Sequence, residues 1–159
     1  MSAPAQLPYI DEHSREIAAP AEQVWHGLLM TMGRGLPSVP GWLAAAWGLE
    51  HATRRGDWHQ TVSIGDAVPG FTVAEAEPAR LLALRGRHRF SDYELRFELG
   101  DTAGGTRLRV ITFADFPGHK GSLYRAAVIG TGGHRVAVRR LLAQVERRAT
   151  SDPARATAA

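Results

Sequence analysis

Residues 58–116 alternate between apolar and polar side chains over most of their length, and from about Ser122 the apolar spacing becomes helical. A period of two is typical of strands with one buried face, whereas a spacing of three and four residues is typical of an amphipathic helix. We predict strands at residues 58–64, 71–76, 80–90, 93–99 and 106–116, with Gly104-Gly105 turning the last hairpin. One long helix follows over residues 122–148. A run of strands before a helix predicts an α+β fold with an antiparallel sheet.

The N-terminal part supplies one more strand and two short helices. Residues 13–17 are predicted to form a strand, and Pro20 suits the first position of a helix because its missing N–H is not needed there. Val24, Trp25, Leu28 and Leu29 recur at helical spacing, which predicts that Trp25 belongs to the core. Gly33 and Gly35 end this helix, and residues 42–47 form the second.

We interpret residues 9–149 as a single domain, with flexible ends at residues 1–8 and 150–159 that are rich in small residues and proline. The C-terminal helix would be roughly 40 Å long at about 1.5 Å per residue. It would therefore cross the whole domain, whose radius of gyration is near 15 Å. A curved sheet wrapped around such a helix leaves space between the two.

Two segments resemble the START-like, or helix-grip, superfamily, whose bacterial members include polyketide cyclase/dehydrase and lipid transport proteins (SRPBCC). The opening HSREIAAPAEQVWHGLL is similar to the strand, Ala-Pro turn and Val-Trp helix of that superfamily. The segment SIGDAVPGFTVAEAEPARLLALRGRHRF is similar to its Gly-Asp strand start, Glu-Pro turn and Leu-rich strand, and the closing helix also resembles that of a subgroup. The resemblance implies a helix-grip fold with a cavity, and no catalytic motif is carried over.

Composition excludes several classes of site. The chain has no cysteine, which rules out disulfides, thiolate metal sites and thiol nucleophiles. No apolar run approaches the roughly 20 residues of a transmembrane helix. Residues 1–14 lack the basic and apolar regions of a secretory signal, so we expect a cytoplasmic protein.

The presumed inner face of the sheet is the main candidate site. It is largely apolar but carries a few convergent polar groups, as ligand pockets do. The alternative is a filled core whose polar atoms are hydrogen-bonded locally, but several polar side chains would be costly to bury unpaired. The predicted ligand-binding residues are Trp58, Gln60, Leu84, His88, Tyr93, Phe97, Thr112 and His134.

Gly130, Gly132 and Gly133 fall in the middle of the predicted C-terminal helix, where each glycine costs about 1 kcal/mol relative to alanine. They indicate a kink or a close approach of a strand or ligand, or alternatively a helix that breaks there and restarts.

We predict neither a metal nor a cofactor. His51, Asp57 and His59 have a spacing that fits no common zinc site, and the glycine-rich segments lack the Lys-Ser/Thr ending of a phosphate-binding loop.

The arginines are predicted to be paired with acidic residues on the outer face of the sheet. A tight turn at Ser91-Asp92 would place Arg89 opposite Glu94 and Arg85 opposite Glu98, and such cross-strand pairs stabilise by roughly 0.2–1 kcal/mol each. The surplus would be Arg87, Arg96, Arg107 and Arg109. Because the net charge is only +3 and the arginines are largely paired, we expect no nucleic-acid partner.

The sequence therefore favours a binder of a hydrophobic small molecule or lipid, held between the sheet and the C-terminal helix. The alternative is an enzyme of the polyketide cyclase or dehydratase type that uses the same cavity, with a histidine or Tyr93 moving protons. No Asp or Glu is expected on the inward faces, which favours the binder. A third hypothesis is a module that binds a partner or a membrane surface through its arginines. The oligomeric state is left open.

Overall fold

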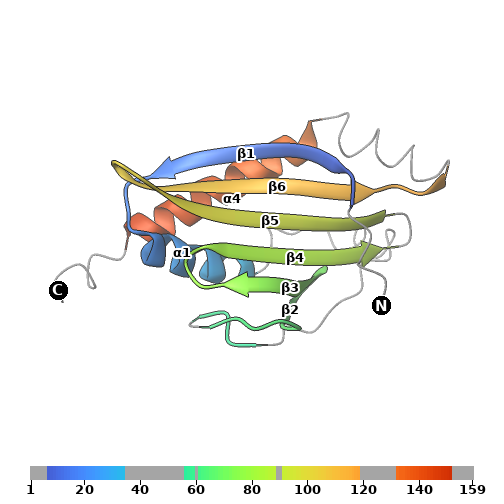
Figure 1. Cartoon of the computed structure of the whole chain (residues 1–159), viewed down its shortest axis with the longest axis horizontal. Helices are drawn as coiled ribbons and strands as arrows, with labels where there is room; N and C mark the ends of the chain where they lie inside the picture. Colours follow the sequence, from blue (N-terminus) through green and yellow to red (C-terminus); the bar gives the residue numbers. More distant parts are fainter. Residues whose placement is uncertain (1–6, 35–55, 60, 89–90, 119–131, 152–159) are drawn as a thin grey trace.

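The computed structural model describes residues 7–34, 56–59, 61–88, 91–118 and 132–151. A six-stranded sheet with the strand order β1-β6-β5-β4-β3-β2 has antiparallel neighbours throughout. Helices α1 and α4 lie on one face of this sheet (Figure 1). The elements are β1 (Tyr9–Ile17), α1 (Ala21–Gly33), β2 (Ala67–Val68), β3 (Phe71–Glu77), β4 (Leu81–His88), β5 (Ser91–Thr102), β6 (Gly105–Asp115) and α4 (Gly133–Thr150).

The α+β class, the antiparallel sheet and the C-terminal helix packed against it are confirmed. The first predicted helix is α1, and the second, at residues 42–47, lies outside the described residues. At the ends of the predicted domain, the Pro8 carbonyl accepts a hydrogen bond from the backbone N–H of Ala114, and Thr150 is the last residue of α4.

The predicted strand at residues 58–64 is wrong. Its described residues form turns and irregular backbone, in which Asp66 accepts a hydrogen bond from the backbone N–H of Ser63 at 2.8 Å. Gly65 has a φ of +92°, and Ile64 is 74% exposed, although Trp58 is buried. Local hydrogen bonds from side chain to backbone compete with strand pairing, and here they prevail.

Helix α4 begins at Gly133, and Gly132 before it has left-handed backbone angles. Gly132 and Gly133 therefore mark the start of the described helix. Gly130 lies outside the described residues, so the choice between a kink and a break-and-restart stays a prediction. The described 18-residue helix is about 27 Å long at about 1.5 Å per residue. Residues 122–131, the earlier part of the predicted helix, lie outside the described residues.

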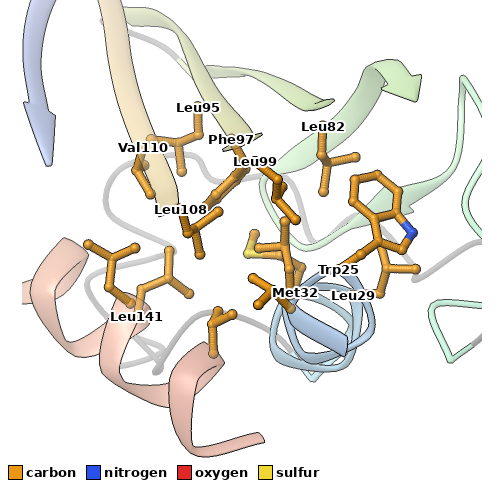
Figure 2. Close-up of a cluster of buried hydrophobic side chains, with 14 of the residues drawn as sticks. Trp25, Leu29, Met32, Leu82, Leu95, Phe97, Leu99, Leu108, Val110 and Leu141 are labelled. Carbon is orange, nitrogen blue, oxygen red and sulfur yellow. The ribbon is translucent and has the colours of Figure 1, made fainter. Parts of the chain in front are cut away.

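The core lies between the sheet and the two helices (Figure 2). Leucine, valine and phenylalanine side chains of β4, β5 and β6 point at Trp25, Leu29 and Met32 of α1 and at Leu141 of α4. Trp25 is 8% exposed and belongs to this cluster, as predicted. The inward sheet residues are Leu82, Leu84, Leu95, Phe97, Leu99, Leu108 and Val110. Burial of these alternating apolar residues is the main favourable term for the fold.

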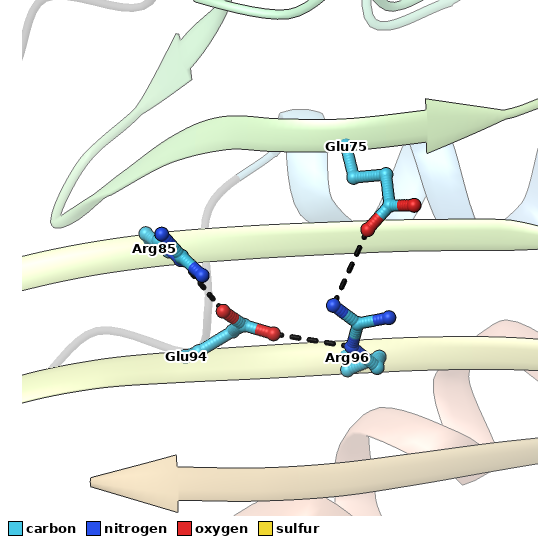
Figure 3. A network of polar contacts seen from close by, with 4 residues as sticks. All are labelled: Glu75, Arg85, Glu94 and Arg96. Atoms are coloured by element: carbon cyan, nitrogen blue, oxygen red, sulfur yellow. Dashed lines mark hydrogen bonds and ion pairs between the residues drawn. The ribbon is translucent and has the colours of Figure 1, made fainter. Parts of the chain in front are cut away.

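The outer face of the sheet carries the predicted lattice of paired charges, but the predicted pairs are wrong. Strand β5 begins at Ser91, so Arg85 lies opposite Glu94 and Arg87 opposite Asp92. Glu94, only 5% exposed, accepts hydrogen bonds from Arg85 (2.6 Å) and Arg96 (3.1 Å), and Arg96 also reaches Glu75 (Figure 3). All four arginines expected as surplus are in fact paired: Arg87 with Asp92, Arg96 with Glu75 and Glu94, Arg107 with Glu16, and Arg109 with Glu12 and Glu98.

Candidate functional site

A polar cluster interrupts the apolar face of the sheet where β1 and β6 meet the start of α4. Register places Asp11 of β1 opposite Thr112 of β6, after an irregularity in the pairing between Tyr9 and Asp11. His13 lies two residues along β1, so its side chain leaves the same face of the strand. His134 lies in the first turn of α4. Sheet register and helix start together bring four polar side chains into one place.

The contacts in this cluster centre on the Asp11 carboxylate and the His134 imidazole. His134 Nε2 lies 3.3 Å from Asp11 Oδ1 and 3.1 Å from Thr112 Oγ1, while His13 Nε2 lies 3.2 Å from Asp11 Oδ2. The side chains of His13, Asp11 and His134 are 16%, 20% and 18% exposed. The cluster is thus neither sealed in the core nor fully solvated.

The geometry selects one tautomer for His134. A carboxylate only accepts hydrogen bonds, so the proton must be on Nε2, where both the Asp11 and Thr112 oxygens can share it. In the neutral imidazole Nδ1 is then an acceptor, and no described residue bonds to it. Within the part of the chain that the structure describes, this Nδ1 of the neutral ring is left for a donor from another molecule, and Asp11 holds the ring in position.

The polar character extends along the inner face of β1. Two residues beyond His13, Arg15 Nε donates a 2.7 Å hydrogen bond to Glu146 of α4. Ile17, the next residue with this orientation, is buried. The contact between β1 and α4 is therefore polar near the start of α4 and again at Glu146, while the neighbouring strands are apolar.

Of the predicted ligand-binding residues, the structure brings Thr112 and His134 together. Leu84, Phe97 and Trp58 lie within the packed core, with Leu84 and Phe97 at 0% exposure. His88 is the last residue of β4 and its side chain is not among those described, and Gln60 lies outside the described residues.

Tyr93 lies apart from the polar cluster. Its hydroxyl donates a 2.8 Å hydrogen bond to the Gly70 carbonyl, on the β3 side of the sheet. Its ring packs edge-on against Phe71, with ring centroids 5.1 Å apart. Both contacts direct Tyr93 away from β6 and therefore away from Thr112.

Sequence reasoning missed Asp11 and His13. The expectation that no acidic residue falls on an inward face is wrong, because Asp11 contacts His134 across the gap between sheet and helix. The predicted strand began at His13, so Asp11 was assigned to no face. The alternation of Asp11, His13, Arg15 and Ile17 was the available signal.

Two further findings concern the described part of the chain. None of its histidine, aspartate and glutamate side chains form a group of three that could hold a metal ion. None of its helices has the length and apolar character needed to cross a membrane.

Comparison with known proteins identifies the fold. No protein-family model matches the sequence, and no curated protein matches it. Solved structures do match, among them TTHA0849 from Thermus thermophilus, with a TM-score of 0.55, 20% identity, and coverage of 92% of this chain and 99% of that one. A conserved protein from Geobacillus kaustophilus matches with a TM-score of 0.53 and 18% identity, over 89% and 95% of the two chains. A Rhodobacter sphaeroides protein matches with a TM-score of 0.51 and 21% identity, over 90% and 95%. At these identities the similarity shows a shared fold.

Proposed function

We propose that the protein binds a small, largely apolar molecule between the sheet and α4, with His134, Asp11 and Thr112 recognising a polar group on it. The observation that carries the proposal is the partly exposed cluster at the edge of an apolar layer, in which none of the described residues bonds to Nδ1 of His134. Burying polar groups beside an apolar layer costs free energy unless each of them has a hydrogen-bond partner. A hydroxyl on the ligand would donate to Nδ1 of His134, and its apolar part would extend toward the core.

We propose that the remaining predicted residues form an apolar wall of the binding site and supply further polar groups to the ligand. Leu84, Phe97 and Trp58 are buried at 1% exposure or less, so they would contact a ligand only after neighbouring side chains shift. The Tyr93 hydroxyl could accept a hydrogen bond from a ligand while it donates to Gly70, but it could donate to a ligand only after leaving Gly70. Gln60 and His88 are proposed as polar groups on the same wall.

A second function, an enzyme of the cyclase or dehydratase type, is favoured by one specific observation. The Asp11–His134 pair joins an imidazole to a carboxylate that orients it, which is a common arrangement for a general base. In a dehydration, His134 Nδ1 would take the proton from a carbon next to a carbonyl. The C–H electron pair would form the new double bond, and the proton would leave with the departing hydroxyl as water.

Binding can be tested with a neutral fluorescent probe, N-phenyl-1-naphthylamine, whose emission rises in an apolar site. We expect saturable binding, and we expect 1-dodecanol to displace the probe more effectively than dodecane because only the alcohol can donate to His134. The variant His134→Gln should lose this preference. His26→Gln, a half-buried histidine on α1 outside the cluster, serves as the matched control.

Two results would contradict the proposal. One is a failure of the probe to bind saturably to the wild-type protein. The other is equal displacement by the alcohol and the alkane in the wild-type protein. Enzymatic function would instead show as turnover of a β-hydroxy carbonyl compound that is lost in both His134→Gln and Asp11→Asn.

A further inference from the structure

A hollow lies where the C-terminal ends of α1 and α4 come together. It has a volume of about 400 Å³ and is lined by Arg34 at the end of α1 and by residues from the last turns of α4. The full lining is Arg34, Gln144, Arg147, Arg148 and Ser151. We call this hollow the arginine cleft.

The three arginines of the cleft differ from those of the sheet. On the sheet, Arg85, Arg87, Arg96, Arg107 and Arg109 each have a carboxylate partner. Within the described part of the chain no carboxylate pairs with Arg34, Arg147 or Arg148. Three positive charges therefore share one hollow, and none of them forms an ion pair with a carboxylate among the described residues.

The charges also act on one another. Burial lowers the pKa of Arg148 below its ordinary value, and repulsion from Arg34 and Arg147 lowers it further. Both burial and repulsion disfavour the positively charged form of the Arg148 side chain. An anion in the cleft would counteract both effects, because it would replace the lost solvent contacts and offset the repulsion among the arginines.

Attraction to helix ends accounts for only part of this arrangement. Cationic side chains in a last turn are favoured by the partial negative charge of the final carbonyl groups. Arg147 lies in that last turn and is exposed, so it could satisfy this attraction while pointing into solvent. The helix ends do not explain why arginines from two different helices line the same hollow.

We propose that the arginine cleft binds a doubly charged oxyanion of the phosphate-monoester class. Guanidinium groups are planar and present paired N–H donors that match two oxygens of a phosphate. The Gln144 amide and the Ser151 hydroxyl can donate to the remaining oxygens. The volume is within the range of small-molecule sites, which leaves room for the organic group of an ester.

This site is separate from the cluster proposed above to recognise a ligand. His134 lies in the first turn of α4 and Arg147 in the last, which places them about 20 Å apart along the helix. Failure of one proposal therefore leaves the other standing, since each has its own probe and its own variants.

The test measures binding of phenyl phosphate to the full chain by calorimetry at constant ionic strength, because salt screens exposed charges. A second arm uses phosphatidylcholine vesicles with and without phosphatidic acid, which presents the same group on a lipid. The double variant Arg147→Gln/Arg148→Gln removes two cleft charges. The matched control Arg139→Gln/Arg140→Gln removes the same charge from exposed positions on α4 outside the cleft.

We expect saturable binding that weakens about tenfold or more in Arg147→Gln/Arg148→Gln and less than about twofold in the control. If only the phosphatidic acid vesicles bind, with the same pattern among the variants, the phosphate belongs to a lipid headgroup and the site stands. Equal weakening in both double variants, or no saturable binding in either arm, would overturn the proposal. If circular dichroism shows that the double variant does not fold, the single variant Arg34→Gln at the exposed end of α1 decides the same question.

Discussion

Replacing Gly86 with alanine should destabilise the protein strongly, although glycine in a strand is usually a weak point. An added Cβ at Gly86 would lie 2.2 Å from the Gly70 carbonyl oxygen and 2.2 Å from the Tyr93 ring. Gly86 pairs with Tyr93 in the β4–β5 register, so the ring lies across the position that the methyl group would take. The Tyr93 ring must therefore leave, and the Gly70 carbonyl must also shift, which disturbs the β2–β3 turn.

The cost follows from what the ring would lose. The hydrogen bond from Tyr93 to Gly70 contributes about 1 kcal/mol, and the edge-on contact with Phe71 contributes about 0.5–1.5 kcal/mol. Overpacking adds a further cost of about 1–3 kcal/mol. We therefore expect the free energy of unfolding to fall by about 3–5 kcal/mol.

The assay is urea denaturation followed by circular dichroism, with Gly100→Ala as the control. Gly100 also lies in a strand, but no atom lies within 4 Å of an added Cβ there. Its variant should change stability by less than about 0.5 kcal/mol. In addition, Tyr93→Ala should cost less in the Gly86→Ala background than in the wild-type protein. A Gly86→Ala variant as stable as Gly100→Ala would refute the reasoning.

Three further predictions concern the core and the charged face. Trp25→Ala should lower the free energy of unfolding by about 3–5 kcal/mol, and a variant that melts like the wild-type protein would show that this α1 face is misassigned. Glu94→Gln should cost about 1–2 kcal/mol in low salt and less in high salt, because it leaves the partly exposed Arg85 and Arg96 less compensated; a cost independent of salt would contradict this. Hydrogen bonding from Arg109 lowers the pKa of Glu12 below its ordinary value, so the stability that this carboxylate adds is present above its unfolded pKa and lost as the pH falls through its folded pKa. The stability difference between wild type and Glu12→Gln should therefore shrink from pH 7 to pH 3, and a constant difference would argue against the pair.

The inner face of the sheet was predictable because it depends only on a period of two. The hairpin between β4 and β5 shows this clearly. The predicted turn at Ser91-Asp92 lies two residues beyond the observed connection, so the pairs involving Arg85 and Glu94 were wrong. A displacement by an even number of residues leaves every side chain on its own face. Leu84 and Phe97 therefore faced inward in the prediction and in the structure.

The failures have local causes. Alternation from Trp58 to Ile64 predicted a strand, but Asp66 and Gly65 provide hydrogen bonds and backbone angles that favour a turn. Alternation alone does not show whether a partner strand is available. The spacing along the C-terminal segment likewise did not reveal that a left-handed Gly132 starts α4 there.

Only part of the candidate site could be predicted from the sequence. Thr112 and His134 follow from strand alternation and helical spacing, because both lie within strongly periodic segments. Asp11 belongs to the site through a pairing between the first and last strands of the sequence, over an irregular register. No local pattern encodes such a long-range contact.

The central claim is that a small apolar molecule with a polar group occupies the space between the sheet and α4. Native mass spectrometry of the full chain, purified from the cells that make it, tests this most directly. We predict one small molecule bound per chain, released on denaturation, retained by His26→Gln and lost or reduced in His134→Gln. A chain that carries no small molecule under gentle ionisation, and that is indistinguishable from His134→Gln, would contradict the account.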